Sequence, residues 1–216
     1  MEEKKISEKE SLELISQMIQ QTQQRITTGA GMPFIAWGVI MMVVATVIGF
    51  GILFTGNGMW MWGYFAIPVL GCAYNYVIKR RAGKTEKPQM KTYIEENLQH
   101  VWKCISFILF VYPLVVLVLR TNEPKAWIGM YFLGVFMPTI GSFITGLMLK
   151  IRHFRFYINI SLSMCLLLLS DLFINNVMTN RYNFLFALIT FFSLVVPGII
   201  INKEARKNSL NQDNNA

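Results

Sequence analysis

Residues 26–78 read ITTGAGMPFIAWGVIMMVVATVIGFGILFTGNGMWMWGYFAIPVLGCAYNYVI, a stretch of 53 residues without Asp, Glu, Lys or Arg. An α-helix needs roughly 20 apolar residues to cross the hydrocarbon core of a bilayer, which is about 30 Å thick. The stretch is too long for one membrane span and has the right length for two. The polar turn Thr55-Gly56-Asn57-Gly58 divides it near its middle. These residues therefore predict a membrane protein that begins with a helical hairpin.

Further apolar blocks follow along the chain. Of its 216 residues, 54% are hydrophobic and 15% are charged, whereas about 25% charged residues is usual in soluble domains. Because backbone polar groups must be satisfied inside a bilayer, we interpret each block as a helix. We expect an all-α polytopic membrane helix bundle over residues 33–202, with six transmembrane helices as three hairpins: 34–54, 59–78, 104–119, 126–149, 156–177 and 182–201. The polar residues 203–216 are expected to form a disordered cytoplasmic tail.

The Lys and Arg positions predict the orientation of these spans. Basic residues are enriched in the cytoplasmic loops of membrane proteins. With the amino terminus inside, 17 of the 20 basic residues are cytoplasmic, and only Arg120, Lys125 and Arg181 fall in outer loops. We therefore expect both termini to be cytoplasmic. The net charge of +8 then serves mainly to orient the chain in the membrane. Nucleic acid is not an expected partner.

Two cytoplasmic segments have the pattern of amphipathic helices. In residues 1–32, Ser7 and Glu10 form a plausible capping box, and apolar residues recur with helical spacing until the break at 28–31. A second capping box, Thr92 with Glu95, starts a similar pattern that leads into the third span. Such faces are covered by the membrane surface, by each other or by a partner. Candidate partners are the lipid bilayer, a cytoplasmic protein, or a second copy of the chain in a homo-oligomer.

The second and fourth spans share a pattern of small and helix-bending residues. Proline inside a helix bends it, and glycine lets a neighbouring helix approach closely. The favoured interpretation is a kinked packing face, and the alternative is a pair of bent helices that line a solute path. The two sets occur at the same spacing: Pro68, Gly71 and Asn75, then Pro138, Gly141 and Thr145.

The fifth span contains Asp171, the acidic residue that falls within a predicted helix. An intramembrane carboxylate is by default a candidate functional residue. The alternative, which we favour, is that Asp171 reaches the outer interface and meets a cation: Arg120, Lys125 or Arg181. Asn159, Ser163 and Ser170 form a polar stripe on the same helix, whose usual role is hydrogen bonding between helices.

The sequence contains no nucleophile motif, phosphate loop or metal-ligand spacing. The three cysteines, Cys72, Cys104 and Cys165, are widely separated and lie in or beside apolar blocks, which favours a role in packing. We therefore expect no catalytic residue, no cofactor and no metal site, and an enzyme is unsupported.

The first residues resemble those of a known group of proteins. The segments SLELISQMI (11–19), Gly31-Met32-Pro33-Phe34 and Trp37-Gly38 resemble the opening of small multi-span bacterial inner-membrane proteins of unassigned function. The resemblance covers about the first 40 residues and the hairpin layout. It implies a location in the bacterial cytoplasmic membrane and no particular chemistry.

Two functions are compatible with these features. The favoured hypothesis is a membrane-embedded interaction or regulatory protein that acts through its cytoplasmic amphipathic helices. The alternative is a small-solute transporter or channel subunit that uses the bent second and fourth helices together with Asp171.

Overall fold

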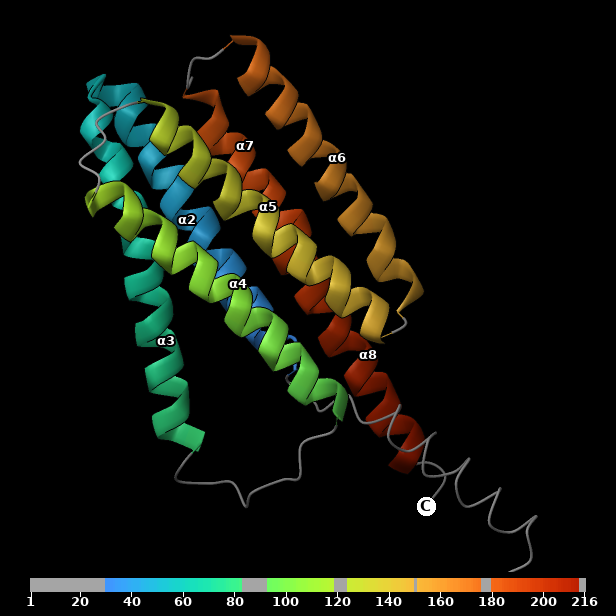
Figure 1. Cartoon of the computed structure of the whole chain (residues 1–216). Coiled ribbons are helices and arrows are strands. Elements are labelled where there is room, and N and C mark those ends of the chain that lie inside the picture. Colours follow the sequence, from blue (N-terminus) through green and yellow to red (C-terminus); the bar gives the residue numbers. More distant parts are fainter. Residues whose placement is uncertain (1–29, 83–92, 119–123, 150, 176–179, 214–216) are drawn as a thin grey trace, which may run out of the picture.

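The computed structural model describes residues 30–82, 93–118, 124–149, 151–175 and 180–213. In these ranges the chain forms helices and no strand, so the expected all-α bundle is confirmed (Figure 1). The predicted amphipathic helix of residues 1–32 lies almost wholly outside the described residues. The elements are α2 (Met32–Thr55), η1 (Gly58–Phe65), α3 (Ala66–Ala82), α4 (Tyr93–Val118), α5 (Pro124–Leu149), α6 (Arg152–Asn175), α7 (Arg181–Thr190), η2 (Phe191–Val195) and α8 (Val196–Asp213).

The helices alternate in direction along the chain, as Figure 1 shows. One end of the bundle contains the start of α2, the end of α3, the start of α4, the end of α5, the start of α6, and α8. We call it the basic end because Lys79, Arg80, Arg81, Arg155 and Lys203 are found there. The opposite end, where α2 ends and α7 begins, is called the turn end.

α2 has clear start and stop signals. Gly31 is its N-cap and Pro33 lies in its first turn, where a missing backbone N–H costs nothing. At the other end Gly56 has φ 64° and donates its N–H to the Ile52 carbonyl, a left-handed cap that glycine adopts without steric cost. The predicted turn between the first two apolar blocks is therefore confirmed.

In the described part of the chain, five helices are long and apolar enough to cross a membrane: Met32–Thr55, Glu96–Val115, Ile128–Leu149, Phe154–Asp171 and Arg181–Lys207. The second expected span, 59–78, is not one continuous α-helix. Its first half is the 3₁₀ segment η1, and only its second half belongs to α3. Pro68 is consequently the third residue of α3, just after the junction between the 3₁₀ and α-helical segments.

The last apolar segment lies at the centre of the bundle. It consists of α7, η2 and α8, and α2, α5 and α6 all pack against it. η2 is a π-helical segment in which Leu194 and Val195 lie directly against Gly38 of α2. The core is built from large apolar side chains of these helices, among them Phe154, Phe186, Ile48, Ile158, Leu168 and Ile189. The first and last spans therefore form a main interface, which a layout of three hairpins did not predict.

Two helices extend beyond the apolar blocks at the basic end. α4 begins at Tyr93, so the amphipathic pattern that was predicted to lead into the third span is confirmed as helix. α4 also contains Pro113, which the sequence interpretation overlooked. α8 continues to Asp213. The expectation of a disordered tail from residue 203 was therefore wrong for residues 203–213. Lys, Glu, Ala and Arg at positions 203–207 are strong helix formers, and Ala205 is still buried.

Candidate functional site

The predicted face of the fourth span packs against α4. A Cβ atom on Gly141 would lie 2.5 Å from Ile105 Cδ1 and 3.1 Å from the Trp102 ring. Trp102 also donates its indole N–H to Thr145 Oγ1 at 3.2 Å. Pro138 is buried and lies inside α5, as expected. These contacts agree with the packing interpretation of this face.

The matching face of η1 and α3 divides into two parts. Gly71 is buried, and a Cβ atom there would lie 2.0 Å from the Trp37 ring of α2. Asn75, one helical turn further, is exposed. In Figure 1, α3 diverges from the other helices toward the basic end. The shared spacing therefore corresponds to a packing contact only at Gly71.

The polar stripe on α6 does not join helices. Asn159, Ser163 and Ser170 are exposed. Ser163 Oγ donates to the Asn159 carbonyl at 2.9 Å and Ser170 Oγ to the Leu166 carbonyl at 2.6 Å, so both hydroxyls bond back into their own helix. The expectation of hydrogen bonds between helices was wrong for this stripe, because it faces away from the core.

Asp171 is exposed near the turn end of α6. Its Oδ2 accepts a hydrogen bond of 2.5 Å from the Tyr182 hydroxyl of α7. The sequence interpretation expected a cation beside Asp171. One of the candidates, Arg120, lies outside the described residues. The sequence interpretation overlooked Tyr182, although a phenol is well suited to the membrane interface. Figure 1 shows α3 and α6 on opposite sides of the bundle, so Asn75 and Asp171 do not belong to one site.

A polar cluster that the sequence interpretation missed lies in the core at the turn end. The Tyr64 hydroxyl of η1 donates to Asn183 Oδ1 at 2.7 Å, and Asn183 Nδ2 donates to Asn180 Oδ1 at 2.9 Å. Asn180 Nδ2 in turn donates to the Gly49 carbonyl of α2 at 2.9 Å. Asn183 is fully buried. We call Tyr64, Asn180 and Asn183 the asparagine relay, and it connects α2, η1 and α7.

Aromatic rings surround the asparagine relay. Tyr131 of α5 lies edge-on to Tyr64 at a centroid distance of 6.3 Å and lies 5.1 Å from the Phe186 ring. The Tyr131 hydroxyl is buried without a hydrogen-bond partner among the described residues. The sequence signal for this cluster was the polar run Asn180 to Asn183 at the start of an apolar block. In the sequence this run resembles a loop, but in the structure α7 begins there.

A second group of buried hydroxyls lies near the middle of the bundle. Thr139 of α5 is 3.3 Å from Ser161 Oγ and 3.7 Å from the Cys165 sulfur of α6. Ser161 Oγ also lies 3.4 Å from the Ile189 carbonyl of α7, to which it can donate. Small hydroxyl residues commonly join membrane helices in this way. The group therefore accounts for close packing of α5, α6 and α7 and contains no base that would activate a nucleophile.

The chain matches no protein-family model, no curated protein and no solved structure. Within the described residues no group of three or more His, Cys, Asp or Glu side chains could hold a metal ion. The asparagine relay and the group around Thr139 both join neighbouring helices, which is a structural role.

Proposed function

We propose that this chain is a six-span protein of the bacterial cytoplasmic membrane, with both termini in the cytoplasm, that acts by binding a partner at the basic end. The enrichment of Lys and Arg at one end of the bundle supports this orientation. η1 and α3 together form one more crossing, second in chain order, in addition to the five long apolar helices. Their eight 3₁₀ residues and 17 α-helical residues extend about 40 Å. The bacterial location follows the resemblance of the first residues.

The outward face of α2 supports a lipid environment. Val39, Val43, Val47, Phe50 and Phe54 recur at helical spacing and are exposed, Val43 by 49%. The opposite face, with Met41, Ala45 and Ile48, is buried in the bundle. A helix that is apolar on all sides is typical of a membrane span.

Val43→Asp tests the lipid environment. A central Asp opposes insertion of a transmembrane helix by about 2.5–3.5 kcal/mol, so we expect a clear drop in the fraction of α2 that inserts in a translocon glycosylation assay. Val43→Leu should insert like the native sequence. If the Asp variant inserted and folded normally, Val43 would face water and the membrane proposal would fail.

One observation carries the proposal of a binding function. At the basic end α4 and α8 continue as helices past their apolar portions, over Tyr93–Lys103 and Asn202–Asp213. Glu96, His100 and Lys103 of α4 and Lys203 of α8 are exposed. A helical extension anchored to a membrane span holds its side chains in fixed positions, which lowers the entropy cost of binding. These extensions, with the amphipathic segment 1–32, form the proposed partner surface.

Affinity capture from native membranes tests this surface. The full chain is compared with a chain that lacks residues 1–30, and a chain that lacks residues 214–216 serves as the control. We expect the first deletion to remove at least one specifically bound protein, or self-association in a cross-linking assay, while the control retains it. An unchanged set of bound proteins and an unchanged oligomeric state would contradict the proposal.

The transport alternative gains no support from the described residues. The faces around Gly71 and Gly141 are filled by Trp37 and Trp102. Asn75 and Asp171 lie on helices at opposite sides of the bundle (Figure 1). A shared solute path through these positions would need a different arrangement of α3.

A further inference from the structure

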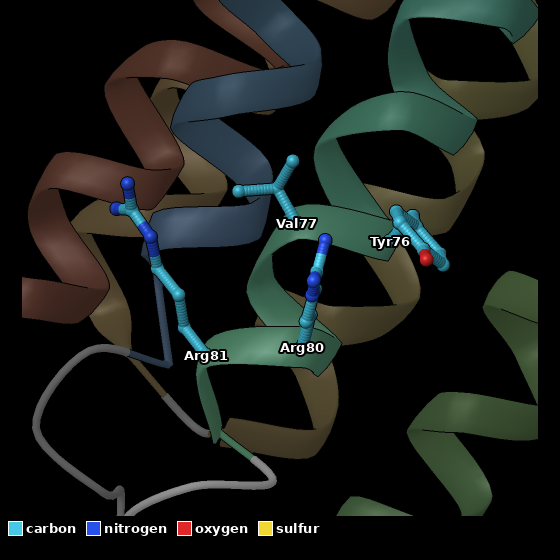
Figure 2. A pocket seen from close by; sticks show the side chains of 4 residues that line it. All are labelled: Tyr76, Val77, Arg80 and Arg81. Atoms are coloured by element: carbon cyan, nitrogen blue, oxygen red, sulfur yellow. The ribbon is translucent and has the colours of Figure 1, made fainter.

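A shallow recess of about 280 Å³ lies on α3 at the basic end. Tyr76, Val77, Arg80 and Arg81 line it, and Figure 2 shows their side chains. Residues four apart are neighbours on a helix surface, so Tyr76 with Arg80 and Val77 with Arg81 form two adjacent ridges. In Figure 2 the Arg80 side chain runs back along the helix between Tyr76 and Val77. The recess therefore combines cationic groups with an apolar and an aromatic wall.

The surface directly above the recess is apolar. Val69, Ala73, Tyr76 and Arg80 follow one another at spacings of three or four residues, which places them on one face of α3. Val69 is 67% exposed and Tyr76 is 66% exposed. Among the described elements α3 packs chiefly against α2 and η1, and these leave the face uncovered along most of its length. An apolar strip thus ends in a guanidinium group at the end of the span.

We propose that this face of α3 binds an anionic glycerophospholipid, with its phosphate at Arg80, its acyl chains along Val69 and Tyr76, and Arg81 adding positive charge beside it. The proposal rests on the membrane placement proposed above. Arginine presents a planar set of N–H donors that matches a phosphate group, and Tyr76 is of a type enriched at the lipid interface. Basic recesses on the cytoplasmic side of membrane helices commonly bind lipid headgroups.

A lipid fits this site better than a soluble phosphate compound. The recess is open, and the four residues that line it include no buried polar group that could hold a small anion from several sides. Its only strong anchors are on one helix edge, beside apolar surface. A ligand that supplies both an anionic head and long apolar chains satisfies all of these groups, whereas free phosphate satisfies the arginines alone.

Lipid selectivity of the full chain in detergent tests the inference. Native mass spectrometry would compare binding of dioleoyl phosphatidylglycerol and dioleoyl phosphatidylcholine to the native chain and to R80Q/R81Q. Each basic group near an anionic headgroup strengthens binding about fivefold. We therefore expect preference for the anionic lipid in the native chain and a loss of about fivefold to 25-fold in the double variant.

A matched control separates a site from general charge. R155Q/K203Q removes the same charge from exposed positions at the basic end and should retain the preference. Equal losses in both double variants would overturn the inference, as would displacement of the lipid by excess inorganic phosphate. Weaker binding of both lipids to Val69→Asn, which keeps both arginines, would support the acyl-chain contact, and unchanged binding of both would contradict it.

The outcome is independent of the partner proposal. If the native chain showed no lipid preference while Val43→Asp still blocked insertion, the lipid inference alone would fail. If Val43→Asp inserted and folded normally, both the membrane placement and the lipid inference would fail.

Discussion

Gly198→Ala is expected to lower the free energy of unfolding by about 1–3 kcal/mol, the usual cost of overpacking. A Cβ atom on Gly198 would lie 2.8 Å from the Gly31 carbonyl oxygen and 3.0 Å from the Ile35 backbone nitrogen. Backbone atoms cannot rotate away as a side chain can, so α2 and α8 must separate. Alanine would otherwise favour the helix by up to about 1 kcal/mol, so the sign of the effect is informative. Thermal unfolding in a mild detergent would measure it.

Gly58→Ala is the matched control for this prediction. No atom lies within 4 Å of a Cβ built on Gly58, so this change should leave stability within about 0.5 kcal/mol. The Gly198 variant should also weaken the hydrogen bond of 3.0 Å from the Gly31 N–H to Asn202 Oδ1. Equal stability of both variants would show that α2 and α8 do not pack at this point.

Asn183→Leu is expected to destabilise the bundle by about 1–3 kcal/mol, because it leaves the buried Tyr64 hydroxyl and the Asn180 amide without their partner. Leucine has the same number and branching of side-chain heavy atoms as asparagine and is more apolar, so lost burial of apolar surface is not the cause. Unfolding by added sodium dodecyl sulfate in mixed micelles would measure the change.

A double-mutant cycle isolates the contact between Tyr64 and Asn183. Tyr64→Phe removes only the donor hydroxyl. The two changes together should cost less than the sum of the single changes, by about 0.6 kcal/mol and at most about 1.7 kcal/mol, the range measured for such bonds in membrane helices. Strict additivity would mean that the two side chains do not interact. Ser163→Ala, on the exposed face of α6, should be nearly neutral.

The helix positions were largely predictable because charge marks their ends. Lys79 and Lys150 bound apolar blocks, and the structure ends α3 and α5 close to them. Hydrophobicity does not encode helix type, so the 3₁₀ segment η1 and its junction with α3 near Pro68 could not be seen. Nor could an apolar sequence reveal which spans meet, and the contact of α2 with α7 depends on glycines whose neighbours are distant in sequence.

The candidate residues were predicted less well than the helices. Gly141 and Thr145 were assigned correctly to a packing face because small residues in apolar helices have one common use. The stripe at Asn159 was assigned to hydrogen bonds between helices and Asp171 to a cation at the outer interface, but the role of each residue depends on which way its face of α6 turns. The asparagine relay was missed because Asn180 and Asn183 stand beside Arg181 between two apolar blocks, where loop residues are expected, while in three dimensions Asn180 approaches the Gly49 carbonyl.

The π-helical segment η2 has a consequence for how this chain can change over generations. A π segment holds one more residue than a regular α-helical path would, and each residue turns a helix by about 100°. The π segment takes up that surplus residue locally, so Ile201 and Ala205 still face the interior after it. Deletion of one residue within Phe191–Val195 would therefore leave a regular α-helix that keeps its direction, whereas an insertion or deletion later in the helix would turn the charged side of α8 toward the interior.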